Sequence, residues 1–566
     1  MRHFVFLIKN SQLMKKLNFQ AIVLFFLAVF FVLISSFSTN RQNNNDDYFE
    51  ITKNLKILAS IYERVNNYYV DQPLPGELMK NAIDAMLKSL DPYTVYIPES
   101  NIEDFRLMTT GQYGGIGASI IKQGDYVVVA EPYENSPAHL AQIKAGDTIL
   151  EVDGMSVYGK SIEEISQLLK GSADSPVAIK TTRFLKIKDV EVIRKKINIP
   201  SVPYYKELKN KVGYIKLNSF TDKASSDVKK AFDELNTRNI EKLILDLRGN
   251  GGGLLIQAVD IVNFFIPKDE LVVQTKGRMQ EINRSYKTRN IPVDLNIPLV
   301  VLIDSYSASA SEIVSGCIQD LDRGVIVGEN SFGKGLVQQT KDLKFGSKIK
   351  LTVAKYYTPS GRCIQKLDYS NKSPLGTADE IADSLIKNYY TKNGREVKDA
   401  RGVFPDIKIE PNYFSKLSET LIYNDFIFNY VNQLSVDSFV IDSPNEFTLS
   451  DKDYEKFKKT LIGKKIEYSN DSEQLLSQLI VATKQEKYYQ TNQEALEQLK
   501  EKFKPNLIED LERNKQEIKQ MLEIEIVSRT HFQKGRIEAS LKGDPYIEEA
   551  VSVLLDSTRY QKILNK

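Results

Sequence analysis

Apolar residues recur at helical spacing in the first third of the chain, after a polar segment at residues 40–50. The runs ITKNLKILASIYERVNNYYV and ELMKNAIDAMLKSL both place apolar side chains three and four residues apart. This spacing lines one face of an α-helix. The sequence therefore predicts helices within residues 51–107.

Shorter apolar runs follow the glycine-rich stretch GQYGGIGASI, which spans Gly111 to Ile120. A strand-like run, YVVVAEP, is followed by SPAHLAQIKAGDTILEVDG and by a helix-like run, SIEEISQLLKG. The resulting order is strand, short helix, strand, helix, strand. It predicts a small independent module that ends near Val192.

From Val212 onward, strand-like and helix-like runs alternate. KLILDLR and PLVVLI (298–303) are almost entirely apolar, as expected of strands buried on both faces. The alternation predicts a layered α/β domain. After about residue 412 the pattern changes to charged amphipathic helices, typical of a packing or dimerisation domain, and we assign no chemistry to it.

The N-terminus reads as a targeting segment. Four basic residues precede an apolar run from Phe19 to Ile34 that only Gln20 interrupts. Because the positive flank comes first, we expect the rest of the chain to be exported, on the periplasmic side of the inner membrane or in the cell envelope. The segment would associate the protein with the membrane unless it is cleaved. Small residues follow it, but no clear A-x-A pattern does, so cleavage stays open.

Composition narrows the classes of function. The 566 residues are 42% hydrophobic and 27% charged, which suits several ordinary globular domains. The net charge is +2, so no strong field for nucleic acid follows, and we expect no nucleic-acid partner. The two cysteines, Cys317 and Cys363, exclude a disulfide framework and a cysteine-rich zinc site. Whether they pair is open, and we expect no metal or organic cofactor.

Ser309 is the first candidate for chemistry. It lies in DSYSASASE, between a buried strand and a helix, where free N–H groups at the helix start suit a developing oxyanion. The same residues also fit an ordinary capping box, because Glu312 stands three residues after Ser309. This stretch alone leaves both interpretations open.

Lys334 is the second candidate, in GENSFGKGLVQ between two expected strands. A solvated loop lysine is the simpler interpretation. Gly328–Lys334 spells the start of a phosphate-binding loop, but Gly335 replaces the required Ser or Thr and a strand follows instead of a helix. Ser331 and Lys334 also spell S-x-x-K, a motif that needs a helix, and the flanking glycines argue against one.

The glycine run RGNGGG (248–253) links a buried strand to a helix. It does not match the dinucleotide fingerprint, because Leu254 occupies the place of the third glycine. A tight turn would explain the glycines. The alternative is that backbone N–H groups of this loop face a substrate carbonyl.

The scarcity of histidine decides among serine mechanisms. The chain contains only His3, His139 and His531, and none lies within residues 200–410. A Ser-His-Asp triad confined to the α/β domain is therefore excluded. A lysine base would need its pKa lowered from about 10.4 to about 7–8, which requires burial away from carboxylates. Gln338, four residues after Lys334 and on the same face of a strand, is a neutral residue that could orient the amine.

Seven motifs follow one another over roughly residues 45–410, and 25 residues separate Ser309 from Lys334. The motifs are LDPYTVYI (90–97), GYIKLNSF, LDLRGNGGGLL, SASASEIV, GKGLVQ, YYTPSGR and GVFPDI (402–407). Together with this separation, they resemble the carboxyl-terminal processing (tail-specific) peptidase family. Gly251 stands where many members have proline, which implies a more flexible loop, and the tail after residue 412 is longer than the family core.

The resemblance implies a PDZ domain inserted between N-terminal helices and a crotonase-like α/β protease core, with a helical C-terminal extension. It implies that Ser309 is the nucleophile, Lys334 the general base and Gln338 the residue that orients the lysine. The Ala310 N–H and that of Gly252 or Gly253 would form the oxyanion hole. The PDZ loop for a substrate's carboxylate would comprise Gln112, Tyr113, Gly114, Gly115, Ile116 and Gly117.

The predicted organisation follows. The segments are a signal or anchor (1–40), an N-terminal helical region (41–104), a PDZ domain (105–195), a serine protease core (196–411) and a helical C-terminal domain (412–566). The predicted function is an exported serine endopeptidase that cleaves proteins with apolar C-termini near those ends. Helices at both ends of the chain suggest a homodimer.

Two other functions remain open. One is a catalytically silent, PDZ-containing scaffold that binds peptides. The other is a nucleotide-dependent enzyme that uses Gly328–Lys334. The natural substrate, the cleavage sequence and the sign of any control by the PDZ domain do not follow from the sequence.

Overall fold

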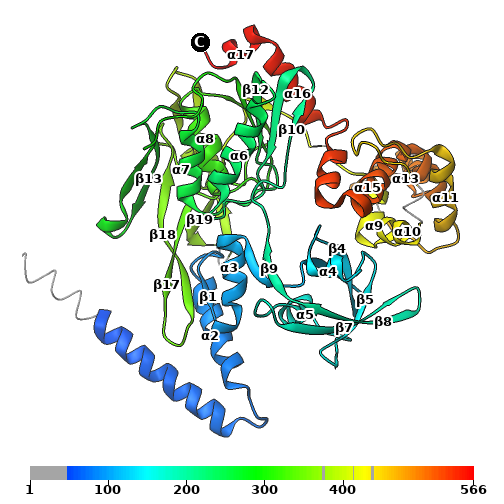
Figure 1. Cartoon of the computed structure of the whole chain (residues 1–566), viewed down its shortest axis with the longest axis horizontal. Helices are drawn as coiled ribbons and strands as arrows, with labels where there is room; N and C mark the ends of the chain where they lie inside the picture. Colours follow the sequence, from blue (N-terminus) through cyan, green and yellow to red (C-terminus); the bar gives the residue numbers. More distant parts are fainter. Residues whose placement is uncertain (1–46, 373–376, 412, 435–438, 469) are drawn as a thin grey trace, which may run out of the picture. The chain divides into compact units, whose positions relative to one another are not determined.

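The computed structural model describes residues 47–566, apart from residues 373–376, 412, 435–438 and 469 (Figure 1). The predicted signal or anchor segment lies outside the described residues. The chain divides into two units, Met1–Met86 and Leu87–Lys566. Within the described residues, no helix has the length and apolar character to cross a membrane.

The helices predicted within residues 51–107 are confirmed in part. Residues 47–68 are helical, and α2 (Pro75–Lys88) and α3 (Ile102–Thr110) follow. A short strand, β1 (Val95–Ile97), separates the last two helices. It pairs antiparallel with β18 (Lys348–Tyr357), so the LDPYTVYI motif belongs to the second unit and to a sheet of its α/β domain.

A six-stranded sheet forms the centre of the α/β domain, and five of its strands, β11, β12, β15, β16 and β23, run parallel. β10 pairs antiparallel with β11 at one edge. The two apolar runs noted above form the central strands β12 and β15, which are buried as predicted. In sheet order the strands are β10 (Tyr204–Leu208), β11 (Val212–Lys216), β12 (Lys242–Asp246), β15 (Leu299–Ile303), β16 (Val325–Gly328) and β23 (Ile407–Lys408).

Helices cover both faces of this sheet (Figure 1). On one face, α6 (Ala224–Asn236), α7 (Leu255–Asn263) and α8 (Ala310–Asp320) pack against alternate side chains of the central strands. On the other face lie α16 (Pro545–Leu555) and α17 (Ser557–Ile563). The C-terminal region predicted at residues 412–566 therefore supplies two helices to the α/β domain, because this sheet has two apolar faces to bury.

The loop that follows β16 leads into a second, five-stranded sheet. In this sheet β17 (Leu336–Asp342) and β13 (Leu271–Gly277) both pair with β18, and β14 (Arg284–Lys287) pairs with β13. Two small hairpins extend the domain. They are β19 (Leu367–Lys372) with β20 (Ala378–Glu380), and β21 (Asn388–Tyr390) with β22 (Glu396–Lys398).

The smaller module has the predicted order of strands and helices. β4 (Tyr126–Pro132), α4 (Pro137–Leu140), β5 (Thr148–Val152), α5 (Ile162–Leu169) and β7 (Pro176–Arg183) follow one another. Its sheet runs β3-β4-β5-β7-β8, so β3 is an edge strand. The remaining strands are β2 (Gln112–Gly115), β3 (Ala118–Gln123), β6 (Met155–Ser156), β8 (Lys186–Ile193) and β9 (Lys195–Asn198).

The predicted amphipathic helices after residue 412 are confirmed. Most of them share one apolar core that includes Tyr454, Phe457 and Leu522. The longest, α15, contains a residue with non-helical backbone angles, Phe532. The helices are α9 (Lys416–Tyr423), α10 (Phe426–Gln433), α11 (Asp451–Leu461), α12 (Asp471–Gln485), α13 (Tyr489–Phe503), α14 (Leu507–Arg513) and α15 (Lys515–Ser540).

If α16 belongs to the core of the α/β domain, truncating its buried side should destabilise the protein. Leu554 is 3% exposed in the core shared with the sheet, whereas its neighbour Leu555 is 47% exposed. We expect Leu554→Ala to lower the free energy of unfolding by about 2–5 kcal/mol, through lost burial and the cavity left behind. Leu555→Ala should change it by no more than about 0.5 kcal/mol. Urea denaturation measures both, and equal effects would contradict this packing.

Candidate functional site

Ser309 stands at the turn between β15 and α8, as the sequence predicts. It is the N-cap of α8, and its φ of 56° with ψ of −109° is an uncommon conformation for a residue other than glycine. Such backbone strain costs about 1–3 kcal/mol and tends to occur at functional sites. The Tyr356 hydroxyl donates to the Ser309 carbonyl at 3.1 Å. The serine is therefore held in a strained position at the start of a fully buried helix.

The Glu312 side chain joins the Ser309 turn to the Lys334 loop. Its Oε2 atom accepts the Ser309 N–H at 2.7 Å and the Lys334 N–H at 2.9 Å. Its Oε1 atom accepts the Ser331 hydroxyl at 2.5 Å and the Gly333 N–H at 2.7 Å. The Ser309 and Lys334 backbone nitrogens, which both donate to Oε2, therefore lie within the sum of their two hydrogen-bond lengths of each other. The structure brings both candidate residues together around one carboxylate.

Glu312 is fully buried, and this burial raises its pKa to about 7. Its four hydrogen bonds oppose the effect, because they favour the charged form. The contact with the Ser309 N–H is the one that the S-x-x-E pattern predicts. The contacts with the Lys334 loop were missed, because they depend on a segment 22 residues away.

The Lys334 side chain is partly buried against an aromatic ring. Its Nζ atom lies 4.0 Å from the centroid of the Tyr93 ring. Burial lowers the pKa of Lys334 to about 8, and the positive charge of Lys350 adds to the shift. Glu312 and Asp91 act in the opposite direction. The lysine is therefore poised to exchange its proton near neutral pH, in the range that a general base requires.

Gln338 lies on β17, beside the Lys334 loop. A register shift between Val337 and Gln338 interrupts the pairing of β17 with β18. The Gln338 Nε2 atom donates to the Thr352 hydroxyl at 3.1 Å. This bond fixes the orientation of the side-chain amide. Its oxygen, the only acceptor of the amide, can then receive a hydrogen bond from an amine.

The glycine run after β12 approaches the Ser309 turn closely. A Cβ atom built on Gly252 would lie 2.9 Å from the Ser309 Cβ and from the Ala310 nitrogen, and Gly252 has a φ of +99°. Only glycine fits this position without strain. The Gly252 N–H donates to the Asn250 side chain at 2.9 Å. As the first residue of α8, Ala310 has an N–H without a helical partner.

The six residues predicted to form a carboxylate-binding loop divide into two parts. Gln112–Gly115 form β2, which pairs antiparallel with β9, so they are not an open loop. Only Ile116 and Gly117 connect β2 to the edge strand β3. Their carbonyl oxygens accept the Ala138 and Tyr133 N–H groups at 2.8 and 2.9 Å. The sequence did not predict β2, because its partner strand lies more than 80 residues later.

A charged network that the sequence did not indicate anchors the start of the glycine run. Arg248 binds Asp246 at 2.7 Å and Asp544, before α16, at 2.8 Å. Burial raises the pKa of the Asp246 carboxyl, but the Arg248 and Lys216 charges outweigh it and hold the pKa below its usual range. The network fixes one end of the loop that reaches Ser309.

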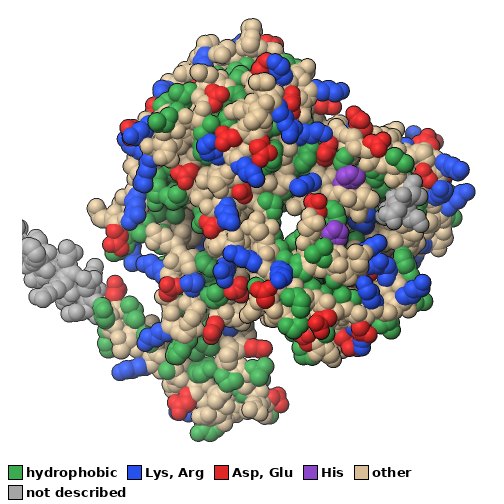
Figure 2. All heavy atoms as spheres, in the orientation of Figure 1, with side chains coloured by type: hydrophobic (Ala, Val, Ile, Leu, Met, Phe, Trp, Pro, Cys, Tyr) green, Lys and Arg blue, Asp and Glu red, His purple; other side chains and the backbone are tan. Residues whose placement is uncertain are grey.

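The rest of the site adds no candidate metal ligands. Across the described residues, no group of three or more His, Cys, Asp and Glu side chains is arranged to hold a metal ion. Cys317 and Cys363 are both free. On the face in Figure 2, basic and acidic side chains are interspersed rather than gathered by sign.

Three protein-family models match separate parts of the chain. "Peptidase family S41" matches residues 211–371, which include Ser309, Lys334 and Gln338. "PDZ domain" matches residues 128–183 of the smaller module. "Probable PDZ-protease, C-terminal helical domain" matches residues 417–554.

Named relatives match over longer spans. The "Carboxy-terminal-processing protease" of Bartonella bacilliformis is 35% identical over 359 residues, 62% of this chain and 81% of the relative. The "Probable CtpA-like serine protease" of Staphylococcus aureus strain MRSA252 is 33% identical over 407 residues, 70% and 81% of the two chains. A solved "Photosystem II D1 C-terminal processing protease" is 28% identical, with a TM-score of 0.35, over 62% of this chain and 92% of the other.

The bridging role of Glu312 can be tested by Glu312→Gln. The amide nitrogen of glutamine cannot accept hydrogen bonds, so two of the four donors lose their acceptor. We expect the Ser309 turn and the Lys334 loop to shift, and labelling of Ser309 by a fluorophosphonate to slow by about 10²-fold. Ser331→Ala removes only one donor and should slow labelling much less. Wild-type labelling of Glu312→Gln would rule out the bridge.

Proposed function

Since this chain belongs to peptidase family S41, among the carboxy-terminal-processing proteases, we propose that it is a serine endopeptidase that uses Ser309 as nucleophile and Lys334 as general base. The observation that carries the proposal is the shared carboxylate of Glu312, which hydrogen-bonds to the backbone of both residues. The lowered pKa of Lys334 supports it, because an amine must be neutral to accept a proton.

The proposed reaction begins when the neutral Lys334 amine takes the Ser309 hydroxyl proton and the serine oxygen attacks a peptide carbonyl. The oxyanion that forms would accept hydrogen bonds from Ala310 N–H and from the glycine run. Gly253 is favoured over Gly252, whose N–H already donates to Asn250. The Lys334 ammonium then protonates the leaving amine. Water hydrolyses the acyl-enzyme, with the same lysine as base.

Two neighbours would adjust Lys334 for this role. The Tyr93 ring shields the amine from water, and a neutral aromatic face does not stabilise a positive charge as strongly as a carboxylate does. The Gln338 carbonyl would accept one amine hydrogen, and so direct the nitrogen lone pair toward Ser309. Both groups orient the lysine without returning its pKa to the ordinary value.

Substrate recognition would involve the PDZ domain and the rim of the catalytic site. A substrate tail would add as a strand to the edge strand β3, with its carboxylate near the Ile116 and Gly117 N–H groups. Exposed apolar side chains stand within three residues of Gly253, Ser309 and Lys334. They are Leu254, Ile256, Tyr306 and Phe332, and they suit substrates with apolar C-termini.

Export rests on the residue pattern of the N-terminal segment, so a location in the periplasm or cell envelope is part of the proposal. The crotonase-like character of the core, membrane association through this segment and a homodimer through the helical ends also remain predictions. We keep the silent scaffold as the second candidate, because it would share the PDZ domain without needing the pair of catalytic side chains.

Ser309→Ala and Lys334→Ala test the mechanism directly. Each should lower the cleavage rate of a protein with an apolar tail by at least about 10³-fold, since each removes a group that acts in the chemical step. Thermal unfolding of the purified variants checks that both are folded. Substantial turnover by either folded variant would exclude the mechanism, and an inactive wild-type protein would favour the scaffold.

The pH profile tests the protonation state of the lysine. Because the neutral amine is the active form, kcat/KM should rise with pH up to about 8, the pKa of Lys334, and then level off. Lys350→Gln removes a neighbouring positive charge, so the pKa of Lys334 should rise and the acidic limb should move to higher pH.

Lys355→Gln is the matched control for this profile. Lys355 lies on the same strand and is exposed, and its charge is not among those that shift the pKa of Lys334. Its profile should coincide with that of the wild type. If the wild type, Lys350→Gln and Lys355→Gln gave the same pH profile, the acidic limb would report the titration of a group other than Lys334.

A further inference from the structure

Lys350 belongs to a row of side chains beside the catalytic site. It pairs with Thr340 of β17 on one side and with Val95 of β1 on the other. Directly opposite residues of antiparallel strands share a face, so these three side chains lie in one row. The neighbouring row on the same face holds Gln338 and Thr352, whose side chains are hydrogen-bonded. The two rows are about 7 Å apart, because two residues separate them along β18.

The row that contains Lys350 is open to solvent and lies close to the Lys334 amine. Thr340 is exposed and Val95 is 38% exposed, whereas Lys350 itself is half-buried. The positive charge of Lys350 acts on Lys334 and is, after burial, the main cause that lowers the pKa of Lys334. A group of the substrate can therefore reach Lys350 from solvent while it remains at the edge of the catalytic site.

The charge of Lys350 has no counter-ion among the described residues. Burial lowers its pKa, and no carboxylate of the described chain opposes that effect. The two carboxylates that act on Lys334 are engaged by other donors. Glu312 accepts four hydrogen bonds, and Asp91 accepts three within its own turn. A half-buried cation in this situation is stabilised when a ligand supplies the missing negative charge.

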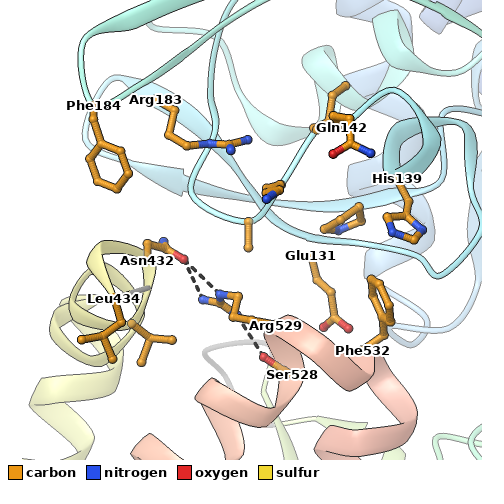
Figure 3. Close-up of a pocket in the computed structure, with 15 residues that line it drawn as sticks. Glu131, His139, Gln142, Arg183, Phe184, Asn432, Leu434, Ser528, Arg529 and Phe532 are labelled. Carbon is orange, nitrogen blue, oxygen red and sulfur yellow. Dashed lines mark hydrogen bonds between the residues drawn. The ribbon is translucent and has the colours of Figure 1, made fainter. Parts of the chain in front are cut away.

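Two arginines elsewhere in the chain show the usual arrangement. Both line a cavity of about 310 Å³ between the PDZ domain and the C-terminal helices (Figure 3). Arg529 donates to the Asn432 side chain at 2.9 Å and binds Glu525 at 2.6 Å. Arg183 binds Asp147 through two nitrogens. Because groups of the protein already hold these arginines, they offer an anion less than the Lys350 ammonium does.

The proposed chemistry gives a negative charge beside Lys350 a further effect. Lys334 becomes an ammonium when it takes the proton of Ser309, so two neighbouring positive charges then repel each other. A substrate carboxylate beside Lys350 would offset this repulsion at the moment when the charge on Lys334 develops. An interaction that strengthens as the transition state forms raises the rate of the chemical step as well as the affinity.

We propose that Lys350 binds a carboxylate of the substrate that lies a few residues beyond the bond that is cut. An extended chain of about three residues spans about 10 Å, which suits the separation of the two rows and the reach of a lysine side chain. The C-terminal carboxylate of a short tail meets this requirement, and so does an acidic side chain at the same place. The inference rests on the proposed function and adds a residue that determines where the substrate is cut.

The first experiment uses the full wild-type chain and three short peptides of otherwise equal sequence. One ends in a free carboxylate about three residues beyond the cut, one ends there in an amide, and one is amidated but carries glutamate at that place. We expect kcat/KM for the free acid to exceed that for the amide by about ten-fold or more, the usual effect of a charged hydrogen bond. The glutamate peptide shows whether an acidic side chain replaces the chain terminus. Equal rates for all three peptides would overturn the proposal.

Variants of Lys350 then assign the preference to this side chain. Lys350→Gln should reduce the ratio of the free-acid and amide rates to less than about two-fold, and Lys350→Arg should restore most of it. Both peptides meet the same Lys334, so its altered pKa cancels in this ratio. Lys348→Gln is the matched control, because Lys348 lies two residues away on the same strand and is already paired with Asp342. It should keep the wild-type ratio.

The outcomes separate this proposal from the proposed function. A wild-type ratio in folded Lys350→Gln would overturn the role of Lys350 and would leave the carboxylate to be recognised by another part of the chain, such as the PDZ domain. Thermal unfolding shows whether each variant is folded, and the comparison of peptides in the wild type needs no variant. Failure of the proposed function would look different, because Ser309→Ala would then cleave all three peptides as well as the wild type does.

Discussion

The Glu312 carboxylate accepts hydrogen bonds from two loops that leave neighbouring strands of the central sheet, β15 and β16, and the geometry of the site depends on this contact. Ser309 follows a strand of the central sheet, whereas Lys334 precedes a strand of the second sheet. The Phe332 N–H donates to the Ser307 carbonyl at 3.0 Å, so one backbone hydrogen bond also joins the two loops. The buried Glu312 side chain adds four hydrogen bonds, two of them to the backbone of Ser309 and Lys334 themselves. Because the carboxylate is buried, losing any of these partners would leave polar groups unsatisfied.

The same carboxylate creates an electrostatic conflict at Lys334. A negative charge nearby favours the protonated amine, while burial and the positive charge of Lys350 favour the neutral one. Burial has the largest effect, and the pKa falls to about 8. Glu312 is itself affected, since burial raises its pKa to about 7. The geometry that joins the two loops and the pKa that makes lysine a base thus depend on the same dry environment.

The sequence predicted those features that local patterns determine. The apolar strands, the turn that presents Ser309 and the order of elements in the PDZ domain all follow from spacing over short segments, and histidine scarcity pointed to lysine. Features that need distant partners were not predictable. Glu312 reads as a helix cap until Lys334 is placed beside it, and Gln112–Gly115 read as a loop until β9 is known. The apolar face of α16 does not reveal that its partner is the protease sheet.

The central claim is that Lys334 is a neutral amine at the pH where the enzyme works. The most direct test is an NMR titration of protein labelled with carbon-13 at the lysine ε-position, in which the Lys334 signal is assigned by its absence from Lys334→Arg. The account predicts a midpoint near 8, the pKa to which burial lowers this group. A midpoint near the ordinary lysine value of about 10.4 would contradict it, because almost none of the amine would then be neutral at neutral pH, against roughly a tenth at a midpoint of 8.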